Sequence, residues 1–137
     1  MRYLGIDYGE KKVGLALSDE AGTMGFPYSI MANTPRLADE LVMLVDEENV
    51  DAIVMGESRD YHGAENPIMK GARALAAVLE ERTGATVFFE PEVLTSAEAR
   101  RAPAKAPKSR APKARVHVDA SAAALILTSY LSRTNHG

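Results

Sequence analysis

Short apolar segments separated by turn residues occupy the first quarter of the chain. Residues 2–6 (RYLGI) and 12–17 (KVGLAL) are apolar and are joined by a Gly-Glu-Lys turn, which predicts a hairpin of two antiparallel strands. Residues 24–31 carry large apolar side chains at every second position, which indicates a third strand. The start of the chain therefore predicts a three-strand antiparallel meander.

Helical and strand patterns alternate in the middle of the chain. A Thr-Pro pair at residues 34–35 is a helix start signal with threonine as the cap, and apolar residues at helical spacing continue to about Glu48. The continuous apolar run 51–56 (DAIVMG) is typical of a buried parallel strand. A second helix is expected over about 64–82, and Gly84 should end it.

The last third of the chain combines a strand, a basic segment and a helix. Residues 86–90 (TVFFE) predict a strand, and Thr95 with a glutamate three positions later forms a capping box that starts a short helix. Residues 102–115 contain three prolines and no apolar side chain larger than alanine, so we expect a flexible loop. Residues 119–131 predict a buried helix. This order predicts an α/β fold with a mixed five-stranded sheet and helices on both faces.

Composition restricts the class of protein. The 137 residues suffice for one core, so we expect a single domain over residues 1–137. With 46% apolar residues and no run of about eighteen consecutive apolar residues, the sequence predicts no membrane span. The N-terminal apolar stretch is shorter than a signal peptide needs, and the absence of cysteine excludes disulfides and thiolate metal sites. These features favour a cytoplasmic location.

Charge is distributed unevenly along the chain. The net charge is −3, but seven of the sixteen basic residues lie between positions 100 and 115, where there is no acidic residue. The remainder carries nine basic and nineteen acidic residues, a balance of −10. A polyanion would therefore meet the chain through this segment, although such a segment can also be a solvated linker. The candidate nucleic-acid-binding residues are Arg100, Arg101, Lys105, Lys108, Arg110, Lys113 and Arg115.

Three carboxylates stand where predicted elements end or begin. Asp7 closes the first strand, Glu92 follows the fifth, and Asp119 precedes the last helix. Strand ends of an α/β sheet converge on one crevice, so the three could share a site. Grouped carboxylates need a cation, and oxygen ligands favour Mg²⁺ or Mn²⁺, two of which would activate water for phosphodiester hydrolysis. The structural alternatives are a helix N-cap for Asp119 and an Asx turn for Asp7.

Four segments resemble the motifs of one known family, in the same order. GIDYGEKKVGLALSDE at residues 5–20 resembles the opening motif of the YqgF/RuvX family, whose members are described as Holliday junction resolvases and as pre-16S rRNA nucleases. VMGESRDYHGAENPIM, PEVLTSAEA and VDASAAALILTSYL resemble its three further motifs. The resemblance implies an RNase H-like fold in which Asp7, Glu92 and Asp119 bind the catalytic metals. Gly9 would let a phosphate backbone approach Asp7 closely.

The chain departs from the family pattern in two motifs. The third motif usually reads aspartate-glutamate-arginine, whereas residues 91–93 read Pro-Glu-Val, which removes an acid and an arginine. In the second motif, Glu57 and Ser58 stand where the family usually has leucine and proline. The three predicted ligands are unchanged, so the affected property is substrate positioning. Glu90 would share the face of the third-motif glutamate if the strand extends that far, which makes it a candidate replacement acid.

The residues and the resemblance together predict a metal-dependent nuclease that acts in the 5′ maturation of pre-16S rRNA. Its partners would be nucleic acid, either precursor rRNA or branched DNA, and ribosomal particles. One alternative is a Holliday junction resolvase, which would need a twofold dimer. Another is a non-catalytic nucleic-acid-binding protein with the same fold. The Asp-x-Gly turn also resembles that of actin-like ATPases and sugar kinases, which need two such domains. The sequence leaves the choice between monomer and homodimer open.

Overall fold

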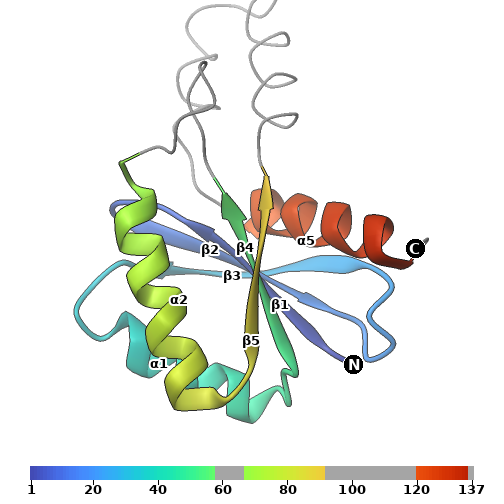
Figure 1. The fold of residues 1–137 in the computed structure, drawn as a ribbon, viewed down its shortest axis with the longest axis horizontal. Coiled ribbons are helices and arrows are strands. Elements are labelled where there is room, and N and C mark those ends of the chain that lie inside the picture. The colour runs from blue at the N-terminus through green and yellow to red at the C-terminus, as the bar shows by residue number, and fades with distance from the viewer. Residues whose placement is uncertain (58–66, 92–119, 136–137) are drawn as a thin grey trace, which may run out of the picture.

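Five strands form one mixed sheet in a computed structural model of the chain, which describes residues 1–57, 67–91 and 120–135 (Figure 1). The strands are β1 (Tyr3–Tyr8), β2 (Lys12–Ser18), β3 (Gly25–Ala32), β4 (Ala52–Glu57) and β5 (Thr86–Pro91). Their order across the sheet is β3-β2-β1-β4-β5. The first three pair antiparallel, and β4 and β5 continue the sheet parallel to β1. The predicted fold class, including its three-strand meander, is confirmed.

Helices cover both faces of this sheet (Figure 1). The helices are α1 (Leu37–Glu47), α2 (Met69–Thr83) and α5 (Ala120–Asn135). Leu4 and Ile6 of β1 belong to the larger core, with residues of α1 and α2, whereas Ala16 and Val54 pack with residues of α5 on the other face. A strand buried on both faces is apolar at every position, which is why the run DAIVMG correctly predicted β4.

Close contact between α5 and the sheet depends on glycine. A Cβ atom on Gly5 would lie 2.9 Å from the Cβ of Leu127 and 3.0 Å from the carbonyl oxygen of Ala123. Side-chain atoms do not approach so closely without displacement, so Gly5 allows the helix to lie directly over β1. At the outer edge of the sheet, the N–H of Gly25 donates to Oγ1 of Thr128 at 3.1 Å. These contacts fix α5 over the centre and one edge of the sheet.

The helix ends agree only in part with the sequence pattern. α1 has Arg36 as its N-cap, without a side-chain cap, so the prediction that Thr34 caps this helix was wrong by two positions. Thr34 instead forms a turn, because its carbonyl oxygen accepts from the N–H of Leu37 at 3.0 Å and its hydroxyl accepts from the N–H of Arg36 at 3.1 Å. Gly84 ends α2 with a φ of 79°, as predicted. α5 continues to Asn135, four residues beyond the predicted end.

The second helix was predicted to start near residue 64, but α2 begins at Met69, after a turn at Pro67 and Ile68, so that prediction was wrong. The predictions outside the described residues concern the capping box at Thr95, the loop 102–115 and the candidate ligands Glu92 and Asp119. These remain predictions. Within the part of the chain that the structure describes, no helix is both long enough and apolar enough to span a membrane.

Candidate active site

Asp7 lies near the carboxyl end of the central strand β1, on the face covered by α5. Gly5, two residues earlier, contacts α5, and alternate residues of a strand share a face. Asp7 is only 7% exposed and takes part in the strand pairing. It is therefore a buried carboxylate of the sheet itself.

Glycines flank Asp7 on both neighbouring strands. Gly14 of β2 is its antiparallel partner. On the other side the parallel register pairs Ile6 with Met55, and its continuation by one residue places Gly56 of β4 beside Asp7. Because glycine has no side chain, neither neighbouring strand projects a side chain beside the carboxylate at these two buried positions. A hydrated cation or a phosphate can approach a carboxylate more closely there than between larger side chains.

Gly14, Asp7 and Gly56 form a row across three strands, and Glu90 of β5 is its fourth member; we call these four residues the Asp7 row. The register pairs Gly56 with Glu90 of β5, so Glu90 and Asp7 lie on one face at two strand spacings, roughly 10 Å. Glu90 is 5% exposed, Oγ of Ser129 donates to it at 2.9 Å, and Arg133 forms an ion pair with it. The structure thus places the candidate replacement acid in the row of Asp7, with its charge compensated by α5.

Sequence reasoning did not identify Ser129 and Arg133 as partners of Glu90. The two helix residues are four positions apart, so they share one face of α5. That spacing was the available signal. It does not indicate which strand residue the helix face will meet, because Glu90 is 43 positions away from Arg133.

Gly9 and Glu57, which the sequence also singled out, lie outside this row. Gly9 directly follows β1, and its carbonyl oxygen accepts a hydrogen bond from Nδ2 of Asn33 at 2.7 Å. Glu57 accepts from Nη2 of Arg73 at 2.9 Å, and the same guanidinium lies 4.7 Å from the ring centroid of Phe89. Since Phe89 packs on the core beneath α1 and α2, Glu57 faces that side of the sheet. The role of Gly9 in phosphate approach remains a prediction.

One of the three predicted metal ligands, Asp7, belongs to the described residues. Within residues 1–57, 67–91 and 120–135, no three His, Cys, Asp or Glu side chains are grouped closely enough to hold a metal ion. The described chain stops at Pro91, directly before Glu92, and resumes at Ala120, directly after Asp119. The buried carboxylate of Asp7, flanked by Gly14 and Gly56, fits a hard divalent cation. The ligand roles of Glu92 and Asp119 remain predictions.

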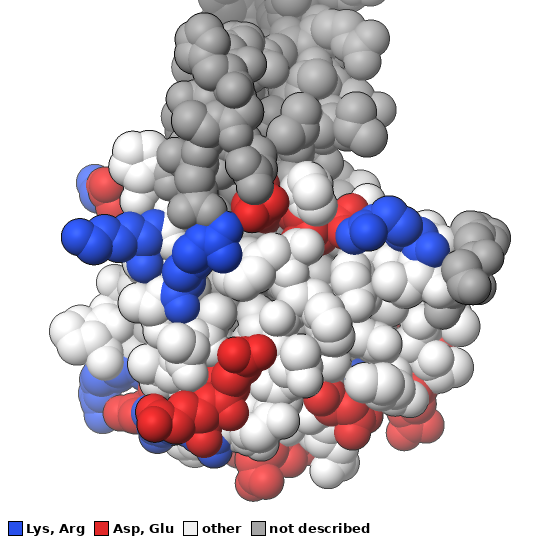
Figure 2. All heavy atoms as spheres, in the orientation of Figure 1, with Lys and Arg blue, Asp and Glu red and all other residues white. Residues whose placement is uncertain are grey.

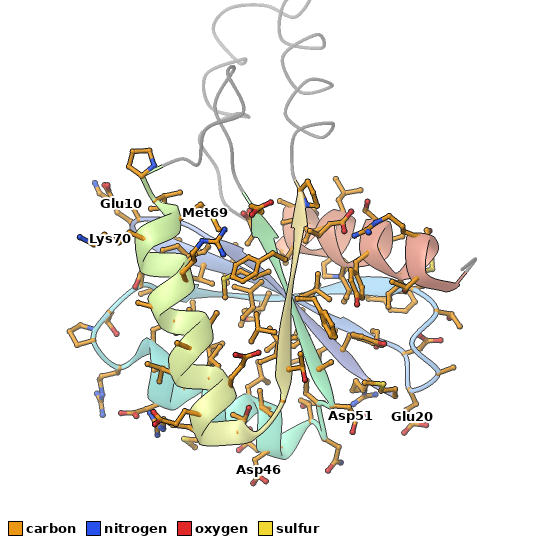
Figure 3. The ribbon with its side chains drawn as sticks, in the orientation of Figure 1. Glu10, Glu20, Asp46, Asp51, Met69 and Lys70 are labelled. Atoms are coloured by element: carbon orange, nitrogen blue, oxygen red, sulfur yellow. The ribbon has the colours of Figure 1, made fainter. Side chains whose placement is uncertain are left out.

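Basic and acidic side chains gather at different ends of the molecule. In Figure 2 several blue side chains, with some red ones between them, lie at the level where the grey segments leave the described fold, and red side chains predominate at the opposite end. Figure 3 places Lys70 at the first of these ends, with Glu10 near it, and Asp46, Asp51 and Glu20 at the other. A hollow of about 510 Å³ lies at the acidic end and is lined in part by Asp46 and Asp51. A polyanion is therefore favoured at the end that holds the Asp7 row and disfavoured at the hollow.

Comparison with known proteins finds relatives over nearly the whole chain. A family model described as RuvX, Holliday junction resolvase, matches residues 1–133. A protein of Nitratidesulfovibrio vulgaris (strain DP4) with the name "Putative pre-16S rRNA nuclease" is 41% identical over 101 residues, which cover 72% of this chain and 71% of that protein. A protein of Oenococcus oeni with the same name is 35% identical over 138 residues, which cover 97% and 95%.

Solved structures share the fold. A structure of Thermus thermophilus RuvC has a TM-score of 0.61 at 16% identity, covering 98% of this chain and 97% of that one. The fowlpox virus Holliday junction resolvase has a TM-score of 0.53 at 11% identity, covering 97% and 99%. At these identities the similarity concerns the architecture alone, and it confirms the predicted RNase H-like arrangement.

Proposed function

Because the chain belongs to the RuvX family of Holliday junction resolvases, we propose that it is a metal-dependent nuclease that hydrolyses phosphodiester bonds of pre-16S rRNA. Relatives at 41% and 35% identity bear the name of a pre-16S rRNA nuclease, which supports this choice of substrate. The structural observation that carries the proposal is the buried carboxylate of Asp7 between Gly14 and Gly56. A buried acid flanked by glycines suits a hard cation and the phosphate that accompanies it.

Asp7, Glu92 and Asp119 would hold Mg²⁺ or Mn²⁺ in this proposal. Bound divalent ions supply a nucleophilic hydroxide near neutral pH and stabilise charge on phosphate oxygens. The chain itself contributes a fixed ligand position, because β1 is the central strand and is paired on both sides. The flanking glycines leave room for the phosphate, and the basic residues between positions 100 and 115 would hold neighbouring phosphates.

Resolution of Holliday junctions is the second candidate function. The description of the family model and the fold shared with Thermus thermophilus RuvC favour it. Paired cuts on symmetric strands need two sites related by a twofold axis, and therefore a dimer. The mass of the protein on a four-way junction separates the candidates, because a strict monomer cannot account for paired cuts.

Cleavage of two labelled substrates tests the proposal. RNA spanning the 5′ end of 16S rRNA and a four-way DNA junction are incubated with Mg²⁺, Mn²⁺ or EDTA. We expect metal-dependent cleavage of the RNA, and we expect Asp7→Asn to reduce it by at least about 100-fold because a neutral amide is a poor ligand for a hard cation. The matched control is Asp46→Asn, the same change at an exposed position of α1 at the acidic end, which should cleave like wild type.

Each other outcome has a definite meaning. Equal cleavage by wild type and Asp7→Asn would contradict the role of Asp7. Cleavage of the junction without cleavage of the RNA would favour the second candidate function. Binding of both substrates without cleavage in either metal would favour the non-catalytic alternative.

A further inference from the structure

Arg133 lies beside the row that contains Asp7. Its Nη2 forms the ion pair with Oε1 of Glu90, and Glu90 is the last member of that row, on β5. The two partners differ in exposure, because the side chain of Arg133 is 59% exposed and that of Glu90 is 7% exposed. The guanidinium is therefore held by a buried acid while much of the side chain faces solvent.

The buried partner makes this ion pair different from an ordinary surface pair. An isolated buried carboxylate is costly, so Glu90 needs both the Ser129 hydroxyl and the guanidinium of Arg133. The guanidinium also lies 5.6 Å from the ring centroid of Tyr130, which stacks on Phe88 of β5. Burial raises the pKa of Tyr130, so its ring is neutral beside the cation at neutral pH. These contacts give Arg133 a defined orientation.

A guanidinium has donors beyond those used by one carboxylate. It presents five N–H groups in a rigid fork, and a fork that is held on one edge can bind a phosphate with another. Arg82 shows the contrast within the same molecule. Arg82, on the last turn of α2, pairs at 2.7 Å with Asp39 on the first turn of α1, but that acid is itself 67% exposed. Within the described residues, no buried acid pairs with Arg82 to fix its direction.

We propose that Arg133, positioned by Glu90, binds a backbone phosphate of the nucleic-acid substrate on the β5 side of the Asp7 site. The inference rests on the proposed function and adds a substrate contact to it. Glu90 lies roughly 10 Å from Asp7, which corresponds to about three base-pair rises of 3.4 Å measured along the axis of a duplex. The contacted phosphate is thus a few nucleotides away from the bond to be cut.

Binding by the Asp7→Asn protein measures this contact without cleavage. Dissociation constants for the labelled RNA and for the four-way junction are measured between 50 and 200 mM salt, with and without Arg133→Gln. We expect the substitution to weaken binding of the preferred substrate by about tenfold and to reduce the slope of log K against log salt by about one. Arg82→Gln is the matched control and should change neither quantity.

Two further variants separate substrate binding from a purely structural role. Arg133→Gln leaves Glu90 without its cation and can lower stability, so the Glu90→Gln and Arg133→Gln double substitution removes both charges together. The double variant should regain thermal stability and still lack the phosphate contact. Arg133→Lys should regain most of the salt slope, because it keeps the charge. A double variant that binds like the Asp7→Asn parent would overturn the inference.

A scan of single neutral linkages locates the phosphate. Methylphosphonates are placed one at a time along the cleaved strand of the preferred substrate. A methylphosphonate at one position, a few nucleotides from the cut, should weaken binding of the Asp7→Asn protein. The same methylphosphonate should have little further effect on the protein that also carries Arg133→Gln. If the effect of the methylphosphonate and the effect of Arg133→Gln added at every position, the inference would be overturned and the nuclease proposal would stand. Conversely, Arg133-dependent binding without metal-dependent cleavage by the wild type would overturn the nuclease proposal alone. Absence of binding to both substrates would overturn both.

Discussion

At the scale of single residues, Asp7 and Glu90 are two buried acids whose neighbouring residues give them different roles. Both are less than a tenth exposed, and both lie on the α5 face of the sheet. Glu90 accepts a hydrogen bond from the Ser129 hydroxyl and forms an ion pair with Arg133, so it links β5 to α5. Asp7 lies between Gly14 and Gly56, which project no side chain beside it. In our proposal that surface is what admits a metal ion and a phosphate.

Asp19 provides a residue-scale test of stability through pH. Its carboxylate accepts hydrogen bonds from the N–H of Thr23 at 2.7 Å, the hydroxyl of Thr23 at 2.5 Å and the N–H of Met24 at 3.2 Å. The bond from the Thr23 hydroxyl, followed by the backbone bonds, holds the pKa of Asp19 below its ordinary value of 3.8. An acid whose pKa is lower in the folded state stabilises above its unfolded pKa, and this contribution is lost as the pH falls through the folded pKa.

We therefore expect wild type to be more stable than Asp19→Asn at pH 7, with a difference that shrinks below about pH 4. Urea denaturation of both proteins at pH 7, 5 and 3 measures the free energies of unfolding. A difference that stays the same at all three pH values would show that the hydrogen bonds to the Asp19 carboxylate do not depend on its charge.

At the scale of elements, α5 can lie on β1 only because Gly5 has no side chain. We expect Gly5→Ala to lower the free energy of unfolding by about 1–3 kcal/mol, because its Cβ would lie 2.9 Å from the Cβ of Leu127. Gly84→Ala should cost about 1 kcal/mol for another reason, since its φ is 79° and no atom lies within 4 Å of the added Cβ.

Asparagine distinguishes the two causes. Gly84→Asn should regain part of the loss, because asparagine tolerates the left-handed region, whereas Gly5→Asn should be less stable than Gly5→Ala because it is larger. The midpoints of urea denaturation measure all four variants. Wild-type stability of Gly5→Ala would mean that the helix does not lie so close to the strand.

The elements were predictable where local pattern alone decides them. The apolar run of β4 and the left-handed end at Gly84 both follow from residues in immediate sequence, and both were predicted correctly. The start of α1 was misplaced because Thr34 satisfies local turn bonds that compete with a helix cap.

The candidate site was predictable only in part. Asp7 stood out as an acid at the end of an apolar strand. Its glycine neighbours depend on the register of three strands, and the partnership of Glu90 with Arg133 depends on how α5 docks. Contacts between distant segments are set by packing of the whole sheet, which local patterns do not encode.

At the scale of the whole molecule, charge separation governs the approach of nucleic acid. Acidic side chains dominate the end opposite the Asp7 row (Figure 2), while the sequence concentrates basic residues between positions 100 and 115. We expect affinity of the Asp7→Asn protein for the 16S RNA to fall by at least about 100-fold between 50 and 200 mM salt. Replacing Lys105 and Lys108 together by glutamine should reduce the salt slope by about two. Affinity that is constant across this range would argue against phosphate contacts altogether.

The last helix joins the two edges of the sheet. It is bonded to Gly25 on β3 through Thr128, 103 positions away, and to Glu90 on β5 through Arg133, 43 positions away. Contacts between such distant segments require much chain entropy to be lost before they form, whereas hairpins close early. We expect the meander to form first, while the face that carries Asp7 is still open to water. The cutting site would then be completed only in the final step of folding, so a partly folded chain would be unable to damage the RNA around it.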